Sequence, residues 1–303
     1  MKKNNYLVIS LLVITLLLSG CGLLKSGQQG GKTEQKNQTK EKVKIGYVQW
    51  ASAEASTYLV KEVLERVGYV VETPVLQAGA MFEGLARGDI DAIVCAWLPK
   101  THKSYWEKRS DKLVDLGANF NGAKIGLVVP SYVEANNISE LKNYSKGFNN
   151  QIVGIDPGAG IMEITENKVM PAYDLNDWKL AKTSGPAMTA SLKKAIDNKK
   201  AIVVTGWTPH WMWAEFDLKY LQDSKGAYGE AESIKSLGRK EIKSDLPEVA
   251  QILENYKLTT QQLGEVMNMI QDGSSPEEAA RKFVDDNLEL INSWLPKGEK
   301  IIE

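Results

Sequence analysis

Short apolar runs alternate with amphipathic segments along most of the chain. In its first part the apolar runs predict three buried strands, at residues 43–49, 69–75 and 91–96. Between these runs, apolar residues recur with helical spacing at 52–66 and 81–87. Strands that alternate with helices predict a parallel sheet with helices on both faces.

The same alternation returns from residue 151. Three further strands are predicted at 152–155, 178–182 and 201–205, and two helices at 158–170 and 188–198. The stretch from Gly79 to His102 loosely resembles the stretch from Gly185 to His210, and each ends with Trp-x-Pro and a histidine. We therefore predict two related lobes, each with a central sheet flanked by helices.

Two segments are expected to connect the lobes, a crossing strand at 124–130 and a return at 233–242. A helical tail follows at 259–270 and 276–294, where Ser275 is a suitable N-cap and Pro276 a suitable first residue. The predicted boundaries are lobe 1 at 43–128, lobe 2 at 129–236, and a return to lobe 1 with the helical tail at 237–303.

The first 42 residues precede this folded body. Residues 1–20 combine a basic start, a short apolar stretch and small residues before Cys21, which predicts a cleaved signal peptide rather than a membrane span. Leu18-Ser-Gly-Cys21 resembles the lipobox of bacterial lipoproteins, in which the cysteine sulfur carries a lipid. Residues 22–42 are rich in Gly, Gln, Lys and Thr and predict a flexible linker. We expect a lipid-anchored protein on the outer face of the cytoplasmic membrane, with an ordinary secreted protein as the alternative.

Composition argues against several classes of function. Removal of residues 1–20 leaves 283 residues with a formal charge of −3, whereas a nucleic-acid-binding protein needs a basic face. Cys95 lies in an apolar run and is expected to be a small buried hydrophobe. His102 and His210 are the only histidines and lack the spacing of zinc ligands. With no Gly-x-Ser-x-Gly or His-Glu-x-x-His motif either, we predict no metal, no cofactor and no catalysis.

Three tryptophans are predicted to lie just past the ends of strands, namely Trp50, Trp97 and Trp207. Ligands of open α/β sheets bind outside the carboxyl ends of the strands, and aromatic cages bind quaternary ammonium groups by cation–π attraction. Because the first two belong to lobe 1 and the third to lobe 2, such a cage is complete only when the lobes close. Trp211 is expected at the rim of this pocket.

A glycine-rich turn, Asp156-Pro-Gly-Ala-Gly160, separates a predicted strand from the next helix. Its glycines let a ligand approach backbone N–H groups at a helix start, where the helix dipole favours an anion. The spacing matches neither Gly-x-Gly-x-x-Gly nor a P-loop, which favours a carboxylate over a pyrophosphate. A tight turn without a ligand is the alternative interpretation.

Four motifs resemble those of the glycine betaine-binding lipoproteins of compatible-solute ABC importers. They are Gly46-Tyr-Val-Gln-Trp50, Ala96-Trp-Leu-Pro-Lys-Thr-His102, Gly154-Ile-Asp-Pro-Gly-Ala-Gly160-Ile-Met162 and Thr205-Gly-Trp-Thr-Pro-His-Trp211. The resemblance implies an α/β periplasmic-binding-protein fold of type II character, with two lobes, the ligand in the cleft between them and delivery to a membrane permease. Some relatives have the lobes in a circularly permuted order, and some carry an acid where this chain has Ala51.

The resemblance also implies a role for individual residues. Trp50, Trp97 and Trp207 would enclose a trimethylammonium group. The backbone amides of Gly160 and Ile161 would bind the carboxylate, with help from His102.

The predicted ligand is glycine betaine or a close betaine such as proline betaine. A choline- or carnitine-binding protein of the same architecture is one alternative, although choline has no carboxylate for the glycine-rich turn. A surface hydrolase of choline esters is another, and it needs a nucleophile with a positioned base, which the sequence does not offer.

Overall fold

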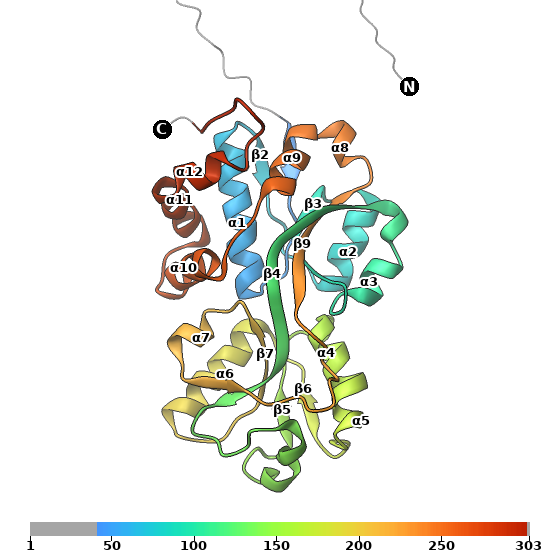
Figure 1. Ribbon diagram of the computed structural model, residues 1–303, viewed down its shortest axis with the longest axis vertical. Helices are drawn as coiled ribbons and strands as arrows, with labels where there is room; N and C mark the ends of the chain where they lie inside the picture. Colours follow the sequence, from blue (N-terminus) through green and yellow to red (C-terminus); the bar gives the residue numbers. More distant parts are fainter. Residues whose placement is uncertain (1–40, 302–303) are drawn as a thin grey trace, which may run out of the picture. The chain divides into compact units, whose positions relative to one another are not determined.

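The computed structural model describes residues 41–301, which form two lobes (Figure 1). The predicted signal peptide, the lipidation site Cys21 and the linker up to residue 40 lie outside the described residues. Between residues 41 and 301, no helix has the length and apolar character needed to cross a bilayer.

The first lobe is built from elements at both ends of the described chain. Its first elements are β1 (Lys42–Lys44), α1 (Ala51–Arg66), β2 (Val70–Glu72), α2 (Ala78–Arg87), β3 (Ala92–Leu98), α3 (Lys103–Glu107) and η1 (Ser110–Lys112). Its last are β9 (Glu232–Arg239), α8 (Ile242–Asp245), α9 (Pro247–Asn255), α10 (Thr260–Gln271), α11 (Pro276–Asp286) and α12 (Leu288–Asn292).

The second lobe comes from the middle of the chain. It contains η2 (Ile138–Tyr144), β5 (Gln151–Val153), α4 (Gly160–Ile164), η3 (Thr165–Val169), α5 (Met170–Ala172), β6 (Lys179–Ala181), α6 (Gly185–Asp197), β7 (Val204–Thr208), α7 (Met212–Glu215) and β8 (Leu218–Tyr220). The expected division into two lobes with helices around a sheet is therefore confirmed.

One long strand, β4 (Leu113–Pro130), runs through both lobes (Figure 1). It pairs with β9 from Leu113 to Ala123 and with β7 from Lys124 to Val128, so the two lobes share a seven-stranded sheet of order β3-β9-β4-β7-β5-β6, with β8 also on β4. The β4–β9 register shifts repeatedly, which allows the strand to curve. The lobe boundaries at 128 and 236 remain a prediction; they fall inside β4 and β9.

The sheet is mixed, and the expectation of a parallel sheet was wrong. Strands β1–β2, β5–β6 and β5–β7 are parallel, whereas β3–β9, β4–β9, β4–β7 and β4–β8 are antiparallel. The chain crosses to the second lobe in β4 and comes back along β9, so these two strands must run in opposite directions. The first half of β4 was missed because Gly117, Asn121 and Gly122 are typical of a loop.

Two helices are more interrupted than expected. The predicted helix at 158–170 consists of α4, a π-helical turn η3 and α5. The predicted tail helix from 276 to 294 breaks at Asn287, where the backbone leaves the helical region (φ −129°, ψ 35°) and the side-chain amide donates to the carbonyl of Phe283 (2.9 Å). Asparagine side chains compete in this way with the helical backbone.

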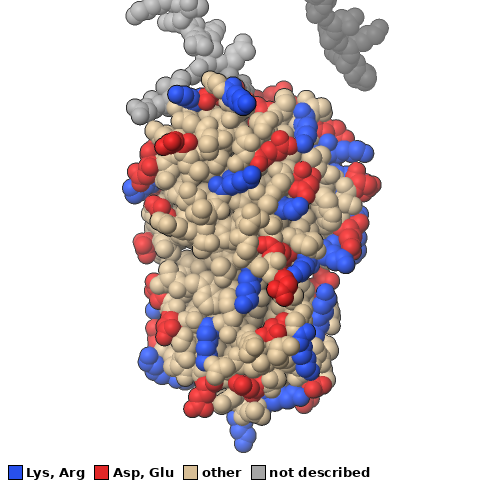
Figure 2. All heavy atoms as spheres, viewed as in Figure 1, with Lys and Arg blue, Asp and Glu red and all other residues tan. Residues whose placement is uncertain are grey.

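The core of the first lobe lies around α1. This helix buries Leu59, Val60, Val63 and Leu64, and α10 and α11 lie against it (Figure 1). Cys95 is buried in β3, as expected, and burial raises the pKa of its thiol to about 12, so it stays protonated. On the outside, basic and acidic side chains are interspersed over the face shown in Figure 2.

The helical tail should contribute directly to stability, because Phe283 of α11 is completely buried. We expect Phe283→Ala to lower the free energy of unfolding by about 3–5 kcal/mol through the cavity it leaves. The exposed neighbour Arg281 provides the control, and Arg281→Ala should change stability by less than about 0.5 kcal/mol. Urea unfolding of both variants tests this, and equal midpoints would contradict it.

Candidate functional site

A small cavity lies between the two lobes. Its lining residues come from both lobes and are Trp50, Ser52, Trp97, Thr101, His102, Ile125, Ile155, Ala159, Gly160, Ile161 and Trp207. All six residues that the sequence singled out for a ligand are among them. The other five residues were not anticipated, since small and aliphatic side chains carry no distinctive signal in a sequence.

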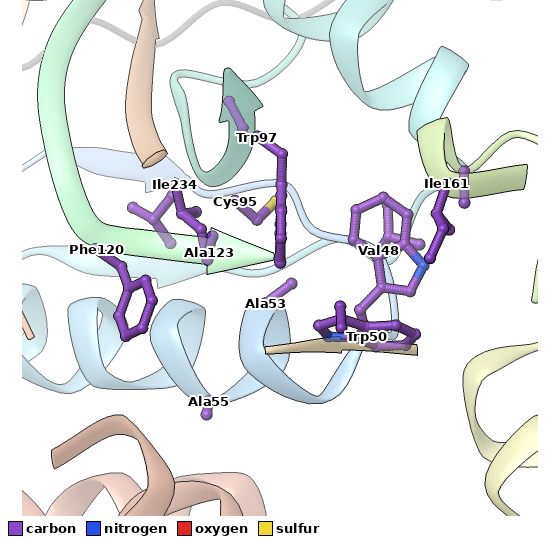
Figure 3. Packing of buried hydrophobic residues seen from close by; sticks show 14 of the residues in the cluster. Val48, Trp50, Ala53, Ala55, Cys95, Trp97, Phe120, Ala123, Ile161 and Ile234 are labelled. Carbon is purple, nitrogen blue, oxygen red and sulfur yellow. The ribbon is translucent and has the colours of Figure 1, made fainter. Parts of the chain in front are cut away.

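The three indoles reach the cavity from different elements. Trp50 immediately precedes α1, as its N-cap residue. Trp97 and Trp207 were expected just past the ends of their strands; instead they lie within β3 and β7, one residue before each strand ends. Each of the three is no more than 6 % exposed, so the cage region is enclosed. Figure 3 shows Trp50, Trp97 and Ile161 in one region, with Trp97 on a strand and Ile161 on a helix.

His102 is a neutral hydrogen-bond donor beside this cage. Its Nδ1 accepts the backbone N–H of Trp97 (2.9 Å), and its ring stacks on that of Trp50 with centroids 5.6 Å apart. Burial lowers its pKa from 6.5 to about 3, so the ring is uncharged at neutral pH. Since Nδ1 accepts a hydrogen bond, the ring proton resides on Nε2, which has no acceptor among the described residues.

The cavity lining also contains two backbone donors that have no acceptor among the described residues. Gly160 and Ile161 are the first two residues of α4, and neither N–H has an acceptor within residues 41–301. The first N–H groups of a helix have no partner in the helix itself, and they attract anions. The arrangement thus combines aromatic faces with donors suited to a carboxylate.

At Gly160 the backbones of the two lobes are in close contact. A Cβ atom at this position would overlap the backbone carbonyl of Thr101 in the first lobe. Hydrogen bonds cross the same cleft nearby, from the Tyr105 hydroxyl to the Gly158 carbonyl (2.8 Å) and from Ser104 Oγ to Glu163 Oε2 (3.0 Å). The lobes are therefore closed on each other around the cavity.

Glu232, the first residue of β9, supports the turn that carries Trp97 and His102. Its buried carboxylate accepts the backbone N–H of Lys100 (2.8 Å), the N–H of Thr101 (3.2 Å) and the Thr101 hydroxyl. This connects the cavity to the strand that joins the lobes. Sequence reasoning missed Glu232, because one acidic residue at the start of a strand has no pattern of its own.

His210 and Trp211 do not reach this cavity, so the expectation that Trp211 lines its rim was wrong. Both line a second cavity with Glu54, Thr189 and other residues of both lobes. The Nδ1 of His210 accepts the backbone N–H of Met212 (3.0 Å), and burial lowers its pKa to about 3. In the part of the chain that the structure describes, no cluster of three or more His, Cys, Asp or Glu side chains is arranged to hold a metal ion.

The close contact between Gly160 and the Thr101 backbone can be tested with a matched control. Gly160→Ala should hold the lobes apart, whereas a Cβ at Gly158 meets only the Tyr105 hydroxyl at 3.7 Å, an ordinary contact. With glycine betaine at saturation, small-angle X-ray scattering should show a larger radius of gyration for Gly160→Ala than for Gly158→Ala. Identical closed scattering profiles would contradict the steric argument.

The two buried histidines predict a loss of stability in acid. Their pKa values are near 3 in the folded protein and about 6.5 in an unfolded chain, so protonation favours unfolding. The stabilisation from their neutral forms is complete above pH 6.5 and is lost as the pH falls toward 3. Between pH 7 and pH 5, each histidine should lower the free energy of unfolding by about 2 kcal/mol.

Denaturant unfolding at pH 7 and pH 5 measures this loss. His210→Gln should reduce the difference between the two pH values by about the amount assigned to one histidine. If the variant and the parent lose the same stability, His210 does not titrate as the structure indicates.

Known proteins share the sequence and the fold of this chain. A family model described as the substrate-binding domain of ABC-type glycine betaine transport systems matches residues 41–286. The glycine betaine/carnitine transport binding protein GbuC of Listeria monocytogenes is 42 % identical over 184 residues, which cover 60 % of this chain and 59 % of that protein. The match thus spans less than two thirds of that relative's length.

Solved structures share the fold. Lactococcal OpuAC in its closed-liganded conformation, complexed with glycine betaine, is 41 % identical, with a TM-score of 0.81 over 85 % of this chain and 100 % of that one. An ABC-transporter choline-binding protein in complex with choline is 26 % identical, with a TM-score of 0.78 over 84 % of this chain and 91 % of that one. The predicted two-lobed periplasmic-binding-protein fold is therefore confirmed. The chain belongs to the substrate-binding domain family of ABC-type glycine betaine transport systems, whose members are solute-binding transport proteins and not enzymes.

Proposed function

We propose that this protein captures glycine betaine, or a close betaine such as proline betaine, and delivers it to the permease of an ABC importer. The observation that carries the proposal is one cavity lined by three indoles and by two backbone N–H groups without acceptors. A betaine has a trimethylammonium group that would lie among the indoles and a carboxylate that would accept from the N–H groups.

The cationic group would lie among Trp50, Trp97 and Trp207. Each ring facing a desolvated cation contributes on the order of 1–2 kcal/mol. Micromolar binding needs about 8 kcal/mol, so the rings supply a large part of it without a formal negative charge in contact with the ligand.

The carboxylate would accept hydrogen bonds from the N–H groups of Gly160 and Ile161 and from Nε2 of His102. Hydrogen bonds to a charged group contribute about 1.5–3 kcal/mol each. Because His102 is neutral, it orients the carboxylate as a donor without adding a positive charge near the ammonium group.

Choline is the second candidate, since a choline-binding protein has the same fold. Choline offers no carboxylate, and the buried N–H groups of Gly160 and Ile161 would then lack an acceptor, at a cost of about 1–3 kcal/mol each. Competition between choline and glycine betaine distinguishes the two, and carnitine belongs in the same assay because GbuC is named for it.

We also propose that Cys21 carries the lipid anchor and that the following residues act as a tether on the outer face of the cytoplasmic membrane; this tether ends before Lys42, where β1 begins, and not after it as the sequence predicted. The lipobox-like Leu18-Ser-Gly-Cys21 supports this. We likewise propose, as a separate point, that the two lobes meet at residues 128 and 236.

The cage can be tested by single substitutions. Calorimetric titration with glycine betaine should give saturable binding that Trp97→Ala or Trp207→Ala weakens by about tenfold or more, because each removes a ring face. Trp106 lies in α3, outside the cavity lining, and Trp106→Ala should bind like the parent. Unchanged affinity in both cage variants would refute the cage.

A further inference from the structure

Asp156 makes a hydrogen bond that joins the cage to the opposite lobe. The Trp50 indole, which belongs to the first lobe, donates its Nε1–H to Oδ2 of Asp156 in the second lobe, at 2.8 Å. Both side chains are buried, with Asp156 only 7 % exposed. Within residues 41–301, Trp97 and Trp207 have no comparable bond from their indole nitrogens, so Trp50 is the one cage ring whose edge is held from across the cleft.

The second carboxylate oxygen of Asp156 is buried without a partner. Oδ1 has no hydrogen bond within the described chain, and no Lys or Arg of this part forms an ion pair with Asp156. A buried carboxylate without such compensation is costly. The carboxylate thus lies at the edge of the Trp50 ring with no described Lys or Arg within ion-pair distance.

We propose that Asp156 is a specificity-determining residue that makes the cage prefer a cationic head group over a neutral one of the same shape. This inference rests on the proposed function. The bond to Nε1 holds the Trp50 ring in position when the lobes close. A charge-assisted bond also polarises the indole, which makes its face more attractive to a cation.

His102 holds the same ring from another direction. It stacks on the face of Trp50 with an interplanar angle of 23°, while Asp156 fixes the edge. Since His102 belongs to the same lobe as Trp50, its contact can persist when the lobes open. The contact with Asp156 requires closure, so the full attraction for the head group develops only in the closed protein.

Two ligands of equal shape can be compared to measure the effect of the head group's charge on binding. In 3,3-dimethylbutanoate a carbon atom replaces the nitrogen of glycine betaine, so the bulk and the carboxylate are kept and the positive charge is lost. Any repulsion between Asp156 and a ligand carboxylate affects both ligands alike. The ratio of their dissociation constants therefore reports the preference for charge, and competition calorimetry measures it.

Asp156→Asn keeps an oxygen for the Trp50 N–H and removes the charge. We expect it to reduce the preference for glycine betaine about tenfold, mainly through weaker binding of glycine betaine. Asp156→Ala should weaken the binding of both ligands, because it also removes the hydrogen bond that holds the Trp50 ring. Asp223→Asn is the matched control: Asp223 accepts from the Tyr173 hydroxyl (2.6 Å) and the Tyr228 N–H (2.7 Å) within the second lobe, and its loss should leave the ratio unchanged.

The outcomes separate this inference from the proposed function. A wild-type ratio in Asp156→Asn overturns the inference, and so does an equal loss for both ligands, which indicates a purely structural role. If the wild-type protein does not bind glycine betaine, the proposed function fails and the inference falls with it. If it binds but Asp156→Asn keeps the preference, only the inference fails.

Discussion

The enclosed site depends on one steric constraint, the contact of two backbones at Thr101 and Gly160. Any side chain at residue 160 would begin where the Thr101 carbonyl lies. Because glycine allows this approach, Tyr105 reaches Gly158, and Trp50 reaches Asp156. The same glycine presents a free N–H to the cavity. Closure and the proposed recognition of the carboxylate therefore depend on the same residue.

The strand β4 connects the two lobes that close around the cavity. It changes partner from β9 to β7 between Ala123 and Lys124, so both lobes are built on one continuous sheet. Glu232, which is paired with Ala123, reaches from β9 to the turn around Thr101. The part of the site in the first lobe is thus attached to the strands between the lobes, which links lobe position to cavity geometry.

The side chains that line the cavity are neutral, and the carboxylate of Asp156 lies behind them, bonded to Trp50. Burial keeps His102 uncharged, the indoles offer polarisable faces, and the donors of α4 are backbone amides. Such a lining can satisfy both charges of a zwitterion without placing a full opposite charge against either of them.

Much of this could be predicted from the sequence. The apolar periodicities located α1, α2 and α6 within a few residues, and the six residues predicted from the four motifs are among the eleven that line the cavity, because periodicity and short motifs are local signals. The direction of the strands, the first half of β4, and the contacts of Glu232 and Asp156 were decided only by the tertiary structure. Their positions depend on contacts between residues more than 100 apart, such as Trp50 and Asp156, and no local pattern records such contacts.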